Sequence, residues 1–504
     1  MTRRTALALF PLAKPAATSG AAPAPASAAT PAPSANPPLH LQPAATLAAL
    51  LAKKKLSARE LLDAHLKQIE RVNPKVNAIV TLVADQAHAK AKLCDEAAAR
   101  GRFLGLLHGL PIAHKDLQDT KGIRTTYGSP LFKDNIPAAD TLLVHRIRSA
   151  GAVTLGKTNT PEFGAGSQTF NPVFGATKNP HDPSKTCGGS SGGAAVALAC
   201  GLIPIADGSD TGGSLRNPAA FCGVVGFRPS PGRVPNLPSR SSWTTISVVG
   251  PMARNVADCA FFLSAIAGPD ERAPLSIHEP GARFAQPLGR NFKGVRVAWF
   301  KDLGGIPFDN RVRAVIDAQR KHFESLGCIV EQAEPDFTGA DEAFRALRAL
   351  NFYHQHSAKA AQYRSQIKAT VLEEVDLGAK LTAPEISRAD TLRSTLYQRA
   401  GEFFSKYEFF ILPVTQVPAF DINQQYVTEI EGRKLGNYID WMRSCYYISV
   451  LHNPAISVPA GFTPQGLPVG MQIVGRHHDD WGVLQMAHAF EQSAAVLRVP
   501  AIAI

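Results

Sequence analysis

Hydrophobic positions recur with helical spacing at the start of the apolar part of the chain. Five apolar residues follow one another there at short intervals: Leu61, Leu62, Leu66, Ile69 and Val72. This spacing predicts an amphipathic helix over residues 58–73. Ser57 and Glu60 form a capping box before it, because each side chain can accept a backbone N–H at the helix start. Asn73-Pro74 is predicted to end the helix.

Short apolar runs predict buried strands along the rest of the chain. They lie at residues 110–116, 153–158, 294–299, 409–413, 455–459 and 470–475. Helices are predicted between or after them at residues 194–199, 312–326, 340–378 and 481–493. Strands that alternate with helices are typical of a layered α/β fold.

The first part of the chain has a different composition. Residues 1–43 are dominated by Ala, Pro, Ser and Thr, which bury too little apolar surface to fold, so we place the folded domain at residues 44–504. Arg3-Arg4 before a short apolar run resembles a twin-arginine export signal, and residues 26–28 resemble a cleavage site. Because Pro11 and Lys14 shorten that run, we favour a cytoplasmic location over export to the periplasm.

The overall composition narrows the class of function. The chain has 504 residues, of which 45% are hydrophobic and 19% charged, as in ordinary globular enzymes. Its net charge is +12, but Lys and Arg are scattered, so neither nucleic acid nor membrane is an expected partner. The seven cysteines lack paired spacing, and residues 477–480 (His-His-Asp-Asp) are interpreted as a solvated loop. No metal or other cofactor is therefore expected.

Two stretches rich in glycine and serine carry the candidate chemistry. Residues 186–193 read Thr-Cys-Gly-Gly-Ser-Ser-Gly-Gly and lead into a helix-forming alanine run. Residues 207–216 read Asp-Gly-Ser-Asp-Thr-Gly-Gly-Ser-Leu-Arg. A turn at a helix start presents backbone N–H groups, and glycines let amides approach a reacting oxygen, as an oxyanion hole requires. The two stretches therefore indicate acyl transfer.

Both stretches, together with Lys115, resemble the amidase signature family. The resemblance continues through residues 217–226, 250–254, 454–459 and 466–475, and covers about residues 45–495. It implies a single α/β domain with a mixed, twisted β-sheet core covered by helices on both sides. Ala194 stands where many members carry a serine.

The resemblance also implies a Ser–Ser–Lys triad. Ser214 would be the nucleophile, Ser190 the bridging serine after a cis peptide, and Lys115 the base. Backbone N–H groups of four residues would form the oxyanion hole: Thr211, Gly212, Gly213 and Ser214. Three further residues are expected to support the site: Ser191, Asp210 and Arg216. A serine needs an adjacent base, and burial of Lys115 after an apolar strand would favour the neutral amine that such a base requires.

Other interpretations of these stretches remain open. A nucleotide phosphate loop is disfavoured because no Gly-Lys-Ser/Thr follows. Residues 188–192 match the G-x-S-x-G elbow of a Ser-His-Asp hydrolase, but a polar loop at 179–185 replaces the strand that should precede it. Cys187 is a further candidate nucleophile, although no base lies beside it in sequence. A non-catalytic protein that kept the fold is disfavoured because all three catalytic residue types are present.

The sequence does not determine which substrate the protein acts on. We expect a small-molecule amide, aryl or alkyl, hydrolysed through an acyl-enzyme, with carbamate (urethane) bonds as an extension. The alternative is an amidotransferase-type subunit that works on aminoacyl-tRNA. Two segments supply aromatic residues that are interpreted either as pocket lining or as ordinary core. They are the predicted helix at 340–378 and the segment 436–453 with Tyr438, Trp441, Tyr446 and Tyr447. A monomer or a homodimer is expected.

Overall fold

An eight-stranded mixed sheet forms the centre of the computed structural model, which describes residues 37–504. The strands, in spatial order, are β10 (Ile329–Gln332), β9 (Arg296–Trp299), β11 (Phe409–Pro413), β15 (Pro468–Gly475), β14 (Ala455–Phe462), β7 (Val225–Arg228), β8 (Val248–Ala253) and β6 (Ile205–Asp210). The pairs of β9 with β10 and with β11 are parallel, whereas every pair from β11 to β6 is antiparallel. The sheet therefore has the mixed character that the sequence predicts.

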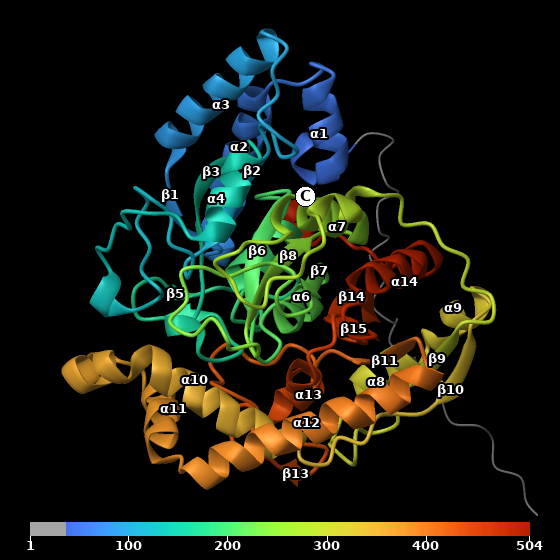
Figure 1. The fold of residues 1–504 in the computed structure, drawn as a ribbon. Helices are drawn as coiled ribbons and strands as arrows, with labels where there is room; N and C mark the ends of the chain where they lie inside the picture. Colours follow the sequence, from blue (N-terminus) through green and yellow to red (C-terminus); the bar gives the residue numbers. More distant parts are fainter. Residues whose placement is uncertain (1–36) are drawn as a thin grey trace, which may run out of the picture. The chain divides into compact units, whose positions relative to one another are not determined.

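A second, three-stranded sheet lies beside the β6 edge. It consists of β1 (Ile79–Leu82), β3 (Val153–Thr158) and β2 (Pro111–Lys115), with β3 in the middle. β2 runs parallel to β3 and packs against β6 (Figure 1). Two two-stranded ribbons complete the strands: β4 (Phe170–Asn171) with β5 (Gly175–Ala176), and β12 (Glu429–Ile430) with β13 (Arg433–Lys434).

Helices flank the sheets. The α-helices are α1 (Ala44–Ala52), α2 (Ala58–Val76), α3 (Ala84–Ala99), α4 (Leu142–Ser149), α5 (Gly192–Ala199), α6 (Arg216–Cys222), α7 (Val256–Ile266), α8 (Asn310–Asp317), α9 (Arg320–Ser325), α10 (Ala340–Tyr363), α11 (Ala369–Lys380), α12 (Ala383–Lys406), α13 (Arg443–Leu451) and α14 (Asp480–Ala494). Short 3₁₀ helices are η1 (Leu39–Leu41), η2 (Pro130–Phe132), η3 (Glu162–Gly164), η4 (Gly281–Ala285), η5 (Arg364–Gln366), η6 (Asp440–Met442) and η7 (Ala501–Ala503). Helices α10, α11 and α12 pack together, in gold and orange in Figure 1, and α10 and α12 also contact α13.

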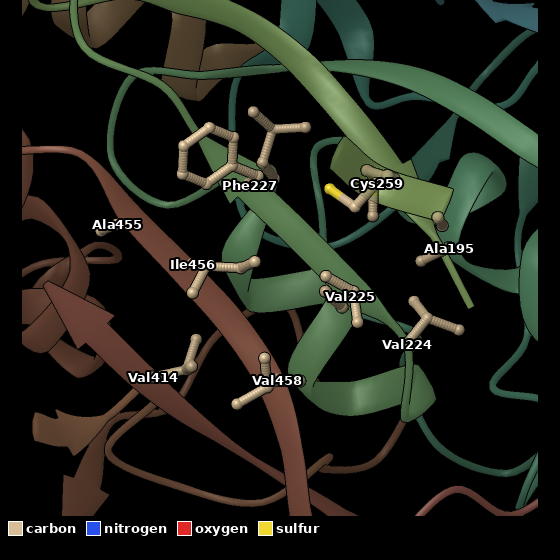
Figure 2. Close-up of a cluster of buried hydrophobic side chains, with 14 of the residues drawn as sticks. Ala195, Val224, Val225, Phe227, Cys259, Val414, Ala455, Ile456 and Val458 are labelled. Atoms are coloured by element: carbon tan, nitrogen blue, oxygen red, sulfur yellow. The ribbon is translucent and has the colours of Figure 1, made fainter. Parts of the chain in front are cut away.

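The main hydrophobic core fills the space between the large sheet and its helices. Figure 2 shows one part of it, where side chains of β7 and β14 meet side chains of α5 and α7. The labelled residues are Ala195, Val224, Val225, Phe227, Cys259, Val414, Ala455, Ile456 and Val458, each at most 2% exposed. Helix α5, which begins within the first Gly/Ser stretch, is buried along its whole length. The stretch is thereby anchored in the core.

Several predicted elements differ in their limits. Helix α2 continues past Pro74 to Val76, because Asn77 in the left-handed region caps it and donates its N–H to Asn73 O at 2.7 Å. The helix predicted over residues 340–378 is two helices, since α11 folds back on α10. Gly378 allows this close approach, because a Cβ there would lie 2.3 Å from Ala349 O.

Two further predictions of helices were incomplete. The helix predicted over residues 312–326 is interrupted between α8 and α9, where Gln319 N–H bonds to Ile316 O, three residues back, in a tighter turn. Helix α12 was not predicted at all, although Thr382 and Glu385 form a capping box at its start. The capping box at Ser57 is present as predicted.

The folded chain begins before the predicted boundary at residue 44. Helix η1 lies ahead of α1, and Gln42 O accepts a hydrogen bond of 2.6 Å from the Arg254 guanidinium. Residues 39–41 are two leucines and one histidine, and so short a segment does not change the average composition from which the boundary was predicted. The predicted export signal and cleavage site, together with most of the predicted tail, lie outside the described residues.

We expect a chain that lacks residues 1–42 to be less stable than a chain that lacks residues 1–37. The longer deletion removes η1 and the Gln42 carbonyl that Arg254 uses, a charged hydrogen bond worth about 1–3 kcal/mol. Denaturant unfolding of the two shortened chains measures the difference. Equal free energies of unfolding would show that residues 38–42 contribute nothing, as the composition suggested.

All seven cysteines are buried, unpaired thiols. Four of them lie on helices, with Cys94 on α3 and Cys445 on α13, and the other three lie in connections. Within residues 37–504, no helix is long and apolar enough to cross a membrane.

Candidate active site

Lys115 lies at the carboxyl end of β2, in the interior of the protein. Every residue of this strand is buried, and its parallel register with β3 places Lys115 opposite Thr158. Asp207 of β6 holds the end of the strand. Its carboxylate accepts the Lys115 N–H at 3.1 Å and lies 2.8 Å from Nδ1 of His114. The lysine backbone is thus fixed to β6 on the side where the two strands meet.

Three hydroxyl groups surround the Lys115 amine. Its Nζ lies 2.8 Å from Ser190 Oγ, 2.8 Å from Ser191 Oγ and 3.0 Å from Ser209 Oγ. Burial lowers the pKa of Lys115 to about 7, although two nearby carboxylates act to raise it. A neutral amine can take the proton of one hydroxyl while its own N–H groups donate to the others. The amine can therefore act as a base near neutral pH.

The first Gly/Ser stretch places two of these hydroxyls over the lysine. The peptide bond between Gly189 and Ser190 is cis, as the resemblance implied. At Gly193 a Cβ would lie 2.3 Å from the backbone nitrogen of Asn159, so a side chain there would collide with the backbone. The glycine lets α5 begin directly behind the two serines. This close packing accounts for the glycines that end the stretch.

The second stretch forms the turn between β6 and α6, and Asp210 organises it. Its carboxylate accepts the backbone N–H groups of Gly213 at 2.9 Å and Leu215 at 3.2 Å. Arg216 binds both carboxylate oxygens, at 2.9 Å each, and Arg228 donates to Oδ1 at 3.1 Å. Burial alone would raise the pKa of Asp210, but the two guanidinium groups hold it well below its ordinary value. The turn is therefore built on a buried, ionised carboxylate.

The backbone N–H groups of this turn differ in availability. The Gly213 N–H is occupied by Asp210. Those of Thr211, Gly212 and Ser214 have no acceptor within the described part of the chain. All three of these residues line a cavity, and Ser214 is 9% exposed. Three unpaired donors thus lie at the cavity wall beside a serine.

The cavity has a volume of about 490 Å³ and begins at these serines. Ser190, Ser209 and Ser214 are among its lining residues. Residues of the connection 231–247, the start of β8 and α10 contribute to the lining. Four aromatic side chains line it: Tyr127, Phe132, Phe163 and Phe352. The arrangement offers a buried base, a serine with adjacent N–H donors, and a cavity for a substrate.

Comparisons with known proteins identify the family of this chain. The model of the Amidase family matches residues 60–484. The chain belongs to the amidase signature family. An acylamidase of Rhodococcus erythropolis is 36% identical over 456 residues, which are 90% of this chain and 95% of that protein.

Two further similarities show the breadth of the amidase signature family. A glutamyl-tRNA(Gln) amidotransferase subunit of Geobacillus kaustophilus is 35% identical over 472 residues, 89% of this chain and 96% of that protein. The crystal structure of a bacterial aryl acylamidase superposes with a TM-score of 0.86 at 27% identity, over 93% of this chain and 99% of that one. The protein is thus an amidase, a single domain with a helix-flanked mixed sheet.

The structure brings most of the predicted amidase site together, but not every pair. Lys115 directly contacts Ser190 and Ser191, and Ser190 shares the cavity with Ser214. No hydrogen bond joins the Ser190 and Ser214 hydroxyls among residues 37–504; the two stretches are instead linked by a hydrogen bond of 3.2 Å from Ser191 N–H to Ser214 O. The two serines thus line the same cavity without a hydrogen bond between their hydroxyls in the described structure.

The sequence also suggested Cys187 as a nucleophile and residues 477–480 as a possible metal site. Cys187 is fully buried, and burial raises the pKa of its thiol to about 12, so it offers no thiolate. His477 stacks against His478 and contacts Tyr397, and no group of three or more metal-ligating side chains occurs in the described 37–504 range.

The interpretation of the four aromatic residues of 436–453 as pocket lining was wrong. Trp441 stacks against Phe221, with ring centroids 6.0 Å apart, and Tyr446 stacks on Phe344 at 4.3 Å. Tyr447 of α13 stacks on Phe337 at 5.3 Å, and half-buried Tyr438 packs against the core with its ring edge-on to Tyr426. From this segment, Ile439 and Met442 face the cavity instead.

Sequence reasoning missed Ser209, Asp207 and Lys157. Ser209 and Asp207 are two residues apart on β6, so the strand's alternation puts both on one face, and the packing of β6 against β2 brings that face to Lys115. Lys157 is a second buried lysine, on β3. Its amine bonds to Gln118 O and to the hydroxyls of Thr120 at 2.9 Å and Thr125 at 3.1 Å. It therefore pins the loop that follows Lys115.

Proposed function

We propose that this amidase hydrolyses the C–N bond of aryl and alkyl amides through an acyl-enzyme on Ser214. The observation that carries the proposal is the Lys115 amine. It is buried among three serine hydroxyls, and its pKa is lowered to about 7, so that it is available as a base. In this proposal Ser190 passes the proton of Ser214 to Lys115.

The first step forms the bond between Ser214 Oγ and the amide carbon. Ser214 gives its proton to Ser190 as Ser190 gives its own to Lys115, and the carbonyl oxygen becomes an oxyanion. The unpaired N–H groups of Thr211, Gly212 and Ser214 stabilise that charge. The relay requires the two serine hydroxyls to approach each other, a contact that catalytic groups often complete only when substrate is bound.

The second half of the reaction returns the proton. Lys115 gives it back through Ser190 to the leaving nitrogen, the C–N bond breaks, and the amine departs. Water then attacks the acyl-enzyme, with the same groups taking its proton, and releases the carboxylic acid. Asp210 and Arg216 maintain the turn that positions Ser214 and touch no reacting atom.

The cavity supports the substrate class. Tyr127, Phe132, Phe163 and Phe352 give it aromatic walls suited to an aryl or alkyl group. Similarity to an acylamidase and to an aryl acylamidase supports the same class. Carbamates present the same carbonyl and nitrogen to the site, and we include them as an extension of the proposal.

A second candidate function is that of an amidotransferase component, and the similarity to a glutamyl-tRNA(Gln) amidotransferase subunit favours it. A panel of anilide, aliphatic amide, carbamate and glutamine substrates, assayed on the chain alone, separates the two. We expect turnover of the anilide and the aliphatic amide. Hydrolysis of glutamine alone would contradict the proposal and would favour the function of an amidotransferase component.

We expect kcat/KM to fall as the pH is lowered through about 7. Below its pKa, Lys115 is an ammonium and cannot accept a proton; above it, the amine is neutral and the rate reaches a plateau. Below the pKa the rate should fall by close to tenfold per pH unit. The midpoint of the decline should lie about three pH units below the pKa of an ordinary lysine, which is about 10.4. A rate that continues to rise up to about pH 10 would contradict a lysine base of lowered pKa.

A further inference from the structure

Positive charge gathers at the end of the cavity formed by α10 and the loop that faces it. Three cationic side chains line the cavity, namely Arg240, Arg348 and Lys359, against one carboxylate, Asp119. Arg348 is neutralised in a buried ion pair with Glu374, and Asp119 accepts the hydroxyl of Tyr127. Arg240 and Lys359 are the two cations of this lining that remain to be accounted for.

Arg240 and Lys359 have no carboxylate partner within residues 37–504. The Lys359 amine makes one hydrogen bond, of 3.3 Å, to Gln355 O. The Arg240 carbonyl accepts from Nε2 of His354 at 2.9 Å, which joins the loop to α10 and sets the two cations near each other. Burial lowers the pKa of Lys359, and the charge of Arg240 lowers it further. Two neighbouring cations without an anion repel each other at this end.

His356 adds an unpaired polar atom between these cations and the aromatic wall. Its ring lies 4.7 Å from the ring of Phe163 and 5.7 Å from that of Phe352, and it is 9% exposed. Its Nδ1 has no hydrogen-bond partner in the described structure, although the residue lines the cavity. A buried polar group of this kind is unfavourable unless a ligand or water pairs with it.

We propose that Arg240 and Lys359, with His356, bind a carboxylate of the substrate, so that the preferred substrates are amides that also carry a carboxylate away from the scissile bond. This inference rests on the proposed amide hydrolysis and names its substrate class more closely. A carboxylate offers the acceptors that a guanidinium, an ammonium and an imidazole can share. It also removes the repulsion between the two cations. The aromatic wall then contacts the apolar part that joins the carboxylate to the amide.

Two matched pairs of substrates test the charge on each side of the amide. Glutaric acid mono-4-nitroanilide and its neutral counterpart 5-oxohexanoyl-4-nitroanilide differ on the acyl side. 4-Acetamidobenzoate and 4′-acetylacetanilide differ on the amine side. We expect wild type to prefer the charged member of at least one pair. The Arg240→Gln/Lys359→Gln double variant should lower the charged-to-neutral ratio of kcat/KM about tenfold, as expected when charged hydrogen bonds are lost.

Controls separate binding of a carboxylate from general effects. Lys67→Gln removes one exposed lysine of α2 and should leave the ratio unchanged. Lys359→Glu should reverse the preference toward the neutral members. Calorimetric binding of all four compounds to the Ser214→Ala variant repeats the comparison without turnover. Equal Kd values within both pairs, or an unchanged ratio in the double variant, would overturn the carboxylate site. Binding of the charged members without any hydrolysis by wild type would instead reject the proposed function.

Discussion

Replacing Lys115 or Ser214 by alanine should lower kcat by about 10⁴- to 10⁶-fold, because members of one proton-relay unit fail together. Lys115 contacts Ser190 directly and Ser214 lies at the unpaired N–H donors, so each substitution removes a member of the proposed relay itself. Ser190→Ala should also be severe, and less so if water occupies the place of its hydroxyl. Steady-state rates with the anilide measure all three losses.

Covalent labelling provides an independent check on the same relay. A fluorophosphonate should modify Ser214 in wild type and fail to do so in Lys115→Ala, as located by mass spectrometry of peptides. Circular dichroism must show an intact fold for each variant. Modification of Ser191 or Cys187 instead, or full activity of Lys115→Ala, would contradict the proposed mechanism.

Replacing Asp210 by alanine should lower the free energy of unfolding by about 3–5 kcal/mol, the range typical of a buried ion pair that loses one partner. Arg216 and Arg228 are both fully buried and would each lose a carboxylate contact. Two backbone N–H groups of the Ser214 turn would lose their acceptor as well. Denaturant unfolding measures the loss, and the anilide assay should show a parallel fall in kcat.

A surface ion pair offers the matched control. Glu342 and Arg388 form a salt bridge while remaining 50% and 65% exposed, so Glu342→Ala should change stability far less. Comparable losses in the two variants would show that the Asp210 cluster contributes no more than an exposed pair. The turn would then owe its shape to the glycines and to the packing of α6.

Local patterns in the sequence were sufficient for much of the fold. The capping box at Ser57 and the apolar runs that became β2, β3 and β11 depend on neighbouring residues alone, and each lies where it was predicted. The separation of α10 from α11 depends instead on how α11 packs back on α10. Sequence spacing carries no record of that contact. Helix α12 is a different case, because its capping box at Thr382 was visible and was not used.

The candidate site likewise has some features that local sequence predicts and others that depend on tertiary packing. The two Gly/Ser stretches were recognised because clustered glycines and serines are rare within an ordinary helix or strand. Their roles were assigned from the resemblance to the family. Ser209 was missed although it lies within one of these stretches, since its approach to Lys115 depends on β2 packing against β6. The engagement of the Gly213 N–H by Asp210 likewise depends on a side-chain orientation that the sequence leaves open. The aromatic wall came from loops and α10, not from the aromatic cluster at 436–453.

Because all seven thiols are buried, the rate at which each one reacts with a thiol reagent measures how often its surroundings open to solvent. Burial raises the pKa of the thiols of Cys187, Cys200 and Cys445 to about 12 each, so a disulfide reagent meets neither an exposed sulfur nor a thiolate in the native state. Labelling can then proceed only through fluctuations that expose each segment. The order in which the cysteines react, read peptide by peptide, would report which elements separate first, from α3 at Cys94 to α13 at Cys445.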